Sequence, residues 1–232
     1  MPLPLVAQLP EAGVACLKEV SRSDRGELTE KLQKITGWTD LQFGNDGVLR
    51  RGSKQPIGGS QRARILVDRA MSASRAIVIE DVSRDPTVVF SRARHARAKH
   101  PALQTAPLFV VQIDFADFQY VTGDQMALKA FDLGWVFLHE LDHILNDSLD
   151  ASYAWETGKC ETHINQMRQE CGLPVRQDYF FTFLPAPRDS VFARRFVRLA
   201  FEKDLGGSKT NFWLVWDADL VGLPDKQIAS LK

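Results

Sequence analysis

Two histidines four residues apart, with a glutamate directly after the first, form the segment of this sequence best suited to chemistry. His139, Glu140 and His143 lie in the sequence HELDH, an HExxH array. On an α-helix, residues four apart share a face with Cβ atoms about 5 to 6 Å apart. Both imidazoles can therefore bind one metal ion at about 2.0 to 2.1 Å. Glu140 lies about 100° further round the helix, where its carboxylate can reach a metal-bound water without binding the metal, which suits a general base.

The residues around the array are mostly apolar, so the helix that carries it should be largely buried. A polar triplet in such a helix costs several kcal/mol unless its groups find partners, which favours a metal site over a coincidental match. Asp142 departs from the usual metallopeptidase pattern, in which the two positions between the glutamate and the second histidine are uncharged. It either faces solvent or accepts a hydrogen bond near the site. The apolar neighbours are Val136, Phe137, Leu138, Leu141, Ile144 and Leu145.

A third metal ligand must lie elsewhere, because a catalytic zinc site has three protein ligands and a water. We favour Glu161, which follows His143 by 18 residues and begins a second predicted helix. Asp150, Asp147 and Glu156 remain alternatives. Glu161 also has an explanation that needs no metal, since a carboxylate in the first turn of a helix is stabilised by the helix dipole.

The elements that must position these residues follow from periodicity and turn signals. A helix over residues 123–146 would carry HExxH, with Gly134 marking a bend or a close backbone approach. A second helix over 161–170 would end at Gly172 and Pro174. Further helices are predicted at 23–35 and 61–73, a hairpin turn at 45–47, and strands at 76–80, 87–90, 108–115, 180–184, 191–201 and 211–216. This order predicts an α+β fold, with helices on one face of a mixed or antiparallel sheet.

Length and composition indicate a soluble globular protein. With 232 residues, 44% of them hydrophobic, the chain can bury a substantial core. We predict one main domain at residues 61–232 and an N-terminal extension at 1–60, whose role the sequence does not define. The three cysteines give no disulfide framework, which fits a reducing compartment.

The chain ends and the charge distribution limit the expected location and partners. The N-terminal segment lacks a basic leader and no stretch reaches 18 apolar residues, so we expect a cytoplasmic protein, or one exported without a recognisable signal peptide, and no membrane contact. Residues 91–100 are basic, but no aromatic residues interleave for base stacking. We interpret them as a solvated loop and do not expect a nucleic-acid partner. Acidic residues dominate 111–161, as a cation site favours.

The segment HELDH and the later segment ETHINQMRQECGLPVRQDY, residues 161–179, together resemble the zincin metallopeptidase superfamily, with a gluzincin-like ligand set. They are similar to bacterial zinc metalloproteases of the effector type, and to related uncharacterised bacterial proteins, that carry HELxH followed by ENxxRxELGLPxRxxY. The resemblance covers about 40 of the 232 residues. Ile164 occupies the first acidic position of the second pattern, and Glu161 lies one turn earlier on the same face. The matching residues are Asn165, Arg168, Glu170, Gly172, Leu173, Pro174, Arg176 and Tyr179.

The resemblance implies a zincin-like fold and zinc-dependent hydrolysis of a peptide or protein substrate, with Zn²⁺ held by two histidines and Glu161. Glu140 would be the general base, and Tyr179, with Arg176 as a further candidate, would stabilise the developing oxyanion. The strand at 108–115 would align extended substrate by edge pairing. An alternative reading, favoured by Asp142, is a catalytically inactive zincin-like module that binds metal or a protein partner.

Overall fold

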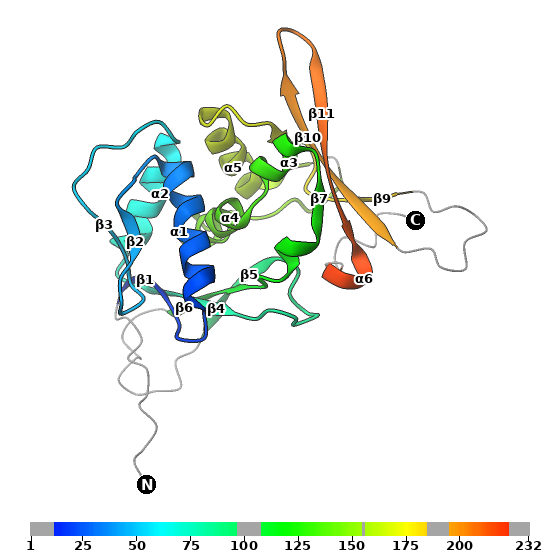
Figure 1. Ribbon diagram of the computed structural model, residues 1–232. Coiled ribbons are helices and arrows are strands. Elements are labelled where there is room, and N and C mark those ends of the chain that lie inside the picture. The colour runs from blue at the N-terminus through cyan, green and yellow to red at the C-terminus, as the bar shows by residue number, and fades with distance from the viewer. Residues whose placement is uncertain (1–11, 97–107, 155, 185–194, 223–232) are drawn as a thin grey trace.

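The computed structural model describes residues 12–96, 108–154, 156–184 and 195–222. Within them the chain forms an α+β fold with a mixed sheet, an antiparallel sheet and helices that lie on one side of the mixed sheet (Figure 1). No helix in these ranges combines the length and apolar character needed to cross a bilayer. The helices are α1 (Arg22–Thr36), α2 (Gln61–Met71), α3 (Gln125–Ala130), α4 (Leu133–Asn146), α5 (Gly158–Glu170), α6 (Ala218–Val221) and the 3-10 helix η2 (Asp117–Tyr120).

The mixed sheet has the strand order β1-β4-β6-β5. Its first three strands run parallel, as expected for short apolar runs buried on both faces, and the outer strand β5 runs antiparallel to β6. The predicted strands at 76–80 and 108–115 are confirmed as β4 and β6. The bounds are β1 (Gly13–Cys16), β4 (Ala76–Asp81), β5 (Ser91–Ala96) and β6 (Leu108–Ile113).

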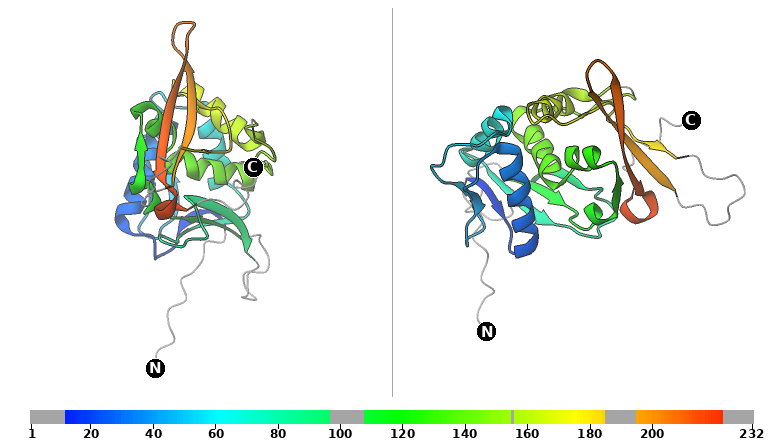
Figure 2. Two further views of the ribbon diagram at one scale, coloured as in Figure 1. Left: turned by 90° about the vertical axis from the view of Figure 1, so that its right-hand side faces the viewer. Right: turned by 45° about the horizontal axis from the view of Figure 1, so that its top comes forward.

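The second sheet is antiparallel and is dominated by the long β10–β11 hairpin, which extends beyond the helices in all three views (Figures 1 and 2). It has the order β7-β11-β10-β8, and β9 also pairs with β10. A short separate hairpin joins β2 to β3 through the predicted turn. The bounds are β2 (Leu41–Phe43), β3 (Leu49–Arg51), β7 (Val121–Gly123), β8 (Val175–Arg176), β9 (Thr182–Phe183), β10 (Phe196–Asp204) and β11 (Lys209–Asp217).

Helix α4 lies between two hydrophobic cores. The larger core fills the space between the mixed sheet and helices α1, α2, α4 and α5, and it contains Trp135, Phe137 and Leu141 of α4. The smaller core lies under the antiparallel sheet and contains Val136, on another face of the same helix. The HExxH helix is therefore packed on both sides and held firmly in place.

Several sequence expectations need correction. The helix predicted at 123–146 is two helices, because the chain turns at Phe131 and Asp132 caps a new helix. Residues 87–90 form no strand. The basic segment is not a loop where it is described, since residues 91–96 form β5, and residues 97–100 lie outside the described ranges. The strand predicted at 191–201 begins at Phe196, and residues 185–194 are likewise outside those ranges.

Two further corrections concern the N-terminal region and the substrate strand. Residues 12–60 do not form a separate extension, because β1 pairs with β4 and α1 contributes Leu28 and Leu32 to the larger core. The strand at 108–115 cannot offer a free edge, because β6 lies between β4 and β5. The outer strand on this side of the sheet is β5.

Candidate functional site

The start of α4 is fixed by its cap and by close contact with α1. The Asp132 carboxylate accepts hydrogen bonds from the backbone N–H groups of Gly134 and Trp135, at 3.0 and 3.3 Å, which satisfies two N-terminal donors of the helix. A Cβ atom at Gly134 would lie 2.8 Å from Cδ1 of Ile35 and 2.8 Å from Cβ of Lys31. Glycine therefore allows α1 to cross α4 closely, one turn before the histidines.

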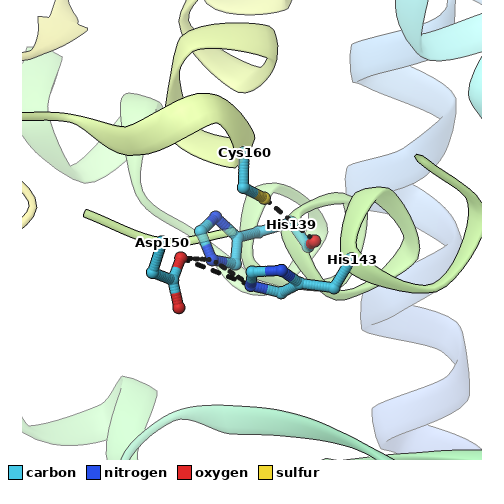
Figure 3. Close-up of side chains that lie close together, drawn as sticks. All are labelled: His139, His143, Asp150 and Cys160. Carbon is cyan, nitrogen blue, oxygen red and sulfur yellow. Dashed lines mark hydrogen bonds and ion pairs between the residues drawn. The ribbon is translucent and has the colours of Figure 1, made fainter. Parts of the chain in front are cut away.

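Three ligand atoms converge at the middle of α4 (Figure 3). Nε2 of His139 lies 3.0 Å from Nε2 of His143, and Oδ1 of Asp150 lies 3.1 and 3.3 Å from these two nitrogens. Ligand atoms bound tetrahedrally at about 2.0 to 2.1 Å are separated from one another by about 3.3 Å. The triangle thus has nearly the dimensions of one face of a metal coordination sphere.

The hydrogen bonds on the far side of each imidazole fix which nitrogen carries the proton. Nδ1 of His143 lies 2.6 Å from the carbonyl oxygen of Ser148, and Nδ1 of His139 lies 3.3 Å from a carboxylate oxygen of Glu161. Both partners can only accept, so both Nδ1 atoms carry hydrogen, and once each imidazole loses its second proton its Nε2 atom presents a lone pair. Two neutral imidazoles with Nε2 atoms 3.0 Å apart would repel each other, so the arrangement requires protons or a metal cation next to these nitrogens.

The ionisation of the cluster agrees with a site that attracts cations. Burial lowers the pKa of His139, but Cys160, Asp150 and Glu161 outweigh this effect, and the pKa lies well above its ordinary value. The pKa of His143 rises to about 11, because hydrogen bonding to Asp150 outweighs burial. Burial would raise the pKa of Asp150, but the two imidazoles hold it well below its usual range. The site therefore binds protons tightly, or a metal ion that replaces them.

Glu161 contacts Nδ1 of His139 and is not part of the cluster formed by the two Nε2 atoms and Asp150. Its carboxylate is 1% exposed and forms ion pairs with Arg168 and with Arg176, the latter at 3.3 Å. Burial would raise the pKa of Glu161, but the two guanidinium groups and His139 hold it far below its usual value. The predicted ligand thus occupies the position of an orienting partner. Arg176 is fully engaged in this network and with the backbone of Asp178 and Tyr179.

Asp150 reaches the histidines because the loop after α4 turns back on itself. Asp147 ends the helix in the left-handed region, at φ 49°, and Leu149 accepts a hydrogen bond from the N–H of Cys160 at 3.2 Å. Gly158 lets the chain pass close to this loop, since a Cβ there would lie 2.4 Å from the backbone nitrogen of Ala151. Spacing alone left Asp150 among several alternatives, because this return depends on contacts with α5.

Tyr179 lies beside the site. Its hydroxyl donates a hydrogen bond of 2.8 Å to Oδ2 of Asp150, the oxygen that does not face the histidines, and its ring stacks on His139 with centroids 6.2 Å apart. Burial and the negative charge of Asp150 raise the pKa of Tyr179 above its ordinary value, so the phenol stays protonated. In this position it orients Asp150 and remains within the same pocket as Glu140.

Glu140 lines that pocket together with His139. It is 6% exposed, and its Oε1 accepts a hydrogen bond of 2.6 Å from the Ser91 hydroxyl at the start of β5. The pocket holds about 620 Å³, its open mouth included. Its apolar wall consists of Val89, Phe90, Phe131, Val136, Phe181, Leu199 and Trp216.

Cys160 is the residue of this cluster that the sequence did not suggest. Its buried thiol lies 3.4 Å from the carbonyl oxygen of His139, and its Sγ is within 4.8 Å of the ligand atoms of the two histidines and Asp150. These four residues could together hold a metal ion. The three cysteines are free thiols, as the sequence indicated.

Asp142 is completely buried and does not face solvent. Its Oδ2 lies 2.9 Å from Nδ1 of His163 on α5, and Oδ1 accepts a hydrogen bond from Asn146. The charge that distinguishes this HExxH from the usual pattern therefore ties α4 to α5. Ser91 escaped the sequence reasoning, and Arg168 was noted only as a match to the second pattern, because the contacts of both depend on the tertiary fold.

Comparison with protein families, curated proteins and solved structures finds no match to this chain. A functional assignment must therefore rest on the geometry of the site.

Proposed function

We propose that the protein is a zinc-dependent peptidase that binds the metal through His139, His143 and Asp150. The observation that carries the proposal is the convergence of two Nε2 atoms and one carboxylate oxygen at 3.0 to 3.3 Å, beside a buried glutamate and an open pocket. Two imidazoles and a carboxylate are a common ligand set of catalytic zinc. Such an ion, when bound, lowers the pKa of a coordinated water and polarises a carbonyl group.

The residues around this site have distinct tasks. Glu140, held by Ser91, takes the proton of the attacking water and delivers it to the leaving amine. Glu161 and Ser148 keep the imidazoles in the tautomer that presents Nε2. Tyr179 holds Asp150 and is the nearest phenol donor for charge that develops on a substrate carbonyl.

The pocket and the outer strand support a peptide substrate. The aromatic and aliphatic wall beside Glu140 suits a large apolar side chain. Among the strands of the described ranges, β5 pairs with β6 alone, and it begins at Ser91, next to Glu140. An extended peptide that pairs with β5 would run past the site. The mixed sheet with an antiparallel outer strand also agrees with the zincin-like fold that the sequence resemblance implies.

The variant Glu140→Gln tests this proposal. Glutamine keeps an oxygen for the Ser91 hydroxyl but cannot accept a proton, so we expect one equivalent of zinc to remain while peptide hydrolysis falls by at least 10²-fold. Metal analysis and turnover of a peptide library that contains large apolar residues measure the two effects. Glu156→Gln is the matched control and should leave both unchanged. Turnover by Glu140→Gln at the wild-type rate would reject the role.

A second candidate function is a metal-binding module without catalysis, and the position of Cys160 favours it. If its thiolate completes a set of four protein ligands, no position is left for water, as in structural zinc sites. Cobalt substitution distinguishes the two cases, because a thiolate ligand adds an intense near-ultraviolet charge-transfer band. That band, lost in Cys160→Ser, supports the closed site, and its absence from the wild-type protein supports the open one.

A further inference from the structure

The residue before Ser91 has a strained backbone. Phe90 has φ 62°, in the left-handed region, which bulky side chains rarely adopt. Such a conformation persists only where the surrounding structure enforces it, and it is often found next to functional groups. In this chain it lies one residue from the hydroxyl that binds Glu140.

Two carboxylate-bearing residues from the segment after β6 hold this turn. The N–H of Phe90 donates a hydrogen bond of 2.8 Å to Oδ2 of Asp117, and the carbonyl oxygen of Phe90 accepts one of 3.0 Å from the N–H of Asp114. Asp114 in turn accepts a hydrogen bond from the N–H of Asp117 through Oδ1, at 3.1 Å. Asp117 is 5% exposed, so the acceptor of the Phe90 N–H is a buried carboxylate.

The turn determines two parts of the candidate site. The ring of Phe90 forms part of the pocket wall and packs against Phe131 and Trp216, with centroids 5.0 and 5.4 Å apart. The next residue, Ser91, starts β5 and donates its 2.6 Å hydrogen bond to Glu140. A relaxed backbone at Phe90 would rotate the ring and the hydroxyl together away from these positions.

We propose that Asp117 is a positioning residue of this site, which holds the Phe90 turn so that Ser91 orients Glu140 and the Phe90 ring shapes the pocket. The catalytic part of this inference rests on the proposed function. The structural part, in which Asp117 binds the Phe90 N–H and thereby places the Ser91 hydroxyl, is independent of the proposed function. Nothing in the HExxH array or its flanks points to Asp117, which lies 23 residues before Glu140.

The test compares Asp117→Ala with Asp117→Asn in the full chain. Alanine removes the acceptor, whereas the asparagine carbonyl oxygen can replace it. We expect Asp117→Ala to lose hydrogen-exchange protection at the Phe90 amide while the α4 amides stay protected and metal content is unchanged. With a peptide that carries a large apolar residue, kcat should fall at least tenfold and KM should rise, and Asp117→Asn should restore both.

Two outcomes would overturn the inference. One is an Asp117→Ala protein with wild-type protection at Phe90. The other is lost protection with kcat and KM unchanged. If Asp117→Ala does not fold, Ser91→Ala replaces it in the test, because this variant loses the hydroxyl that binds Glu140 and keeps the Phe90 turn. A tenfold fall in kcat supports the inference. An unchanged kcat rejects it. If the wild-type protein hydrolyses no peptide, the proposed function fails, and exchange at the Phe90 amide still tests the structural part.

Discussion

Replacing Asp150 and Glu161 separately should show which carboxylate binds the metal. In Asp150→Ala, the oxygen that lies 3.1 and 3.3 Å from the two Nε2 atoms is lost, and two imidazoles alone do not hold zinc. We expect zinc content far below one equivalent after dialysis. The Asp150 side chain is about one third exposed, whereas the Glu161 side chain is buried, so the metal-free fold should lose less stability in Asp150→Ala than in Glu161→Gln.

Glu161→Gln should lower the free energy of unfolding strongly and weaken zinc binding only moderately. The substitution leaves Arg168 and Arg176, which are 2% and 9% exposed, without their shared carboxylate. Breaking a buried ion pair by removing one partner costs about 3 to 5 kcal/mol. The glutamine oxygen can still accept from Nδ1 of His139, so zinc affinity should fall by only about 10- to 100-fold, as for other partners that orient a metal ligand.

Two measurements on the same preparations separate these effects. Competition with a chelator gives zinc affinity, and urea unfolding of the metal-free proteins gives the free energy of unfolding. The exposed-loop variant Glu156→Gln is the control for both. A folded Glu161→Gln protein without zinc, alongside an Asp150→Ala protein with one equivalent, would refute the reasoning and make Glu161 the ligand.

Three further predictions concern the surroundings of the site. Tyr179→Phe removes the hydrogen bond to Asp150, and chelator competition should show zinc affinity reduced about 10-fold. Gly134→Ala should lower the free energy of unfolding by about 1 kcal/mol, despite better helix propensity, because the new methyl group would lie 2.8 Å from Ile35; a stabilised variant would contradict the close crossing. Burial raises the pKa of Asp117 to about 7 in the folded protein, so the free energy of unfolding of the wild-type protein should fall as the pH rises from about 4 to about 7. Asp117→Asn cannot ionise, so its free energy of unfolding should equal that of the wild-type protein near pH 4. Above pH 7 it should be higher by at most about 4 kcal/mol. Urea unfolding across this pH range measures the difference, and a constant difference would contradict it.

The parts of the fold that depend on local signals were predictable from the sequence. The helix predicted at 23–35 is confirmed as α1, because the spacing of Leu28 and Leu32 is a local signal, and the structure ends it at Gly37 in the left-handed conformation. The run at 76–80 became β4. The break before α4 was missed because the apolar pattern continues across it, and only the capping role of Asp132 reveals a new helix.

Some features of the candidate site also follow from local sequence signals, and others depend on tertiary contacts. One helical turn determines that His139 and His143 meet, and the close approach at Gly134 follows from a glycine inside a helix. The choice between Asp150 and Glu161 does not follow from spacing, because both lie within reach of a helix face. It depends on the return of the loop toward α5 and on the two arginines that occupy Glu161. Ser91 comes from a strand paired to the sheet, so no local pattern could link it to Glu140.

The position of α4 between two cores means that its chemistry cannot be separated from the rest of the chain. An excised peptide spanning residues 133–150 would contain both imidazoles and the aspartate, yet it would lack every packing surface that keeps the helix folded. Grafting the motif onto another scaffold would encounter the same obstacle, unless the host supplied an apolar layer against each flank. Metal binding should therefore report on the integrity of both halves of the molecule at once.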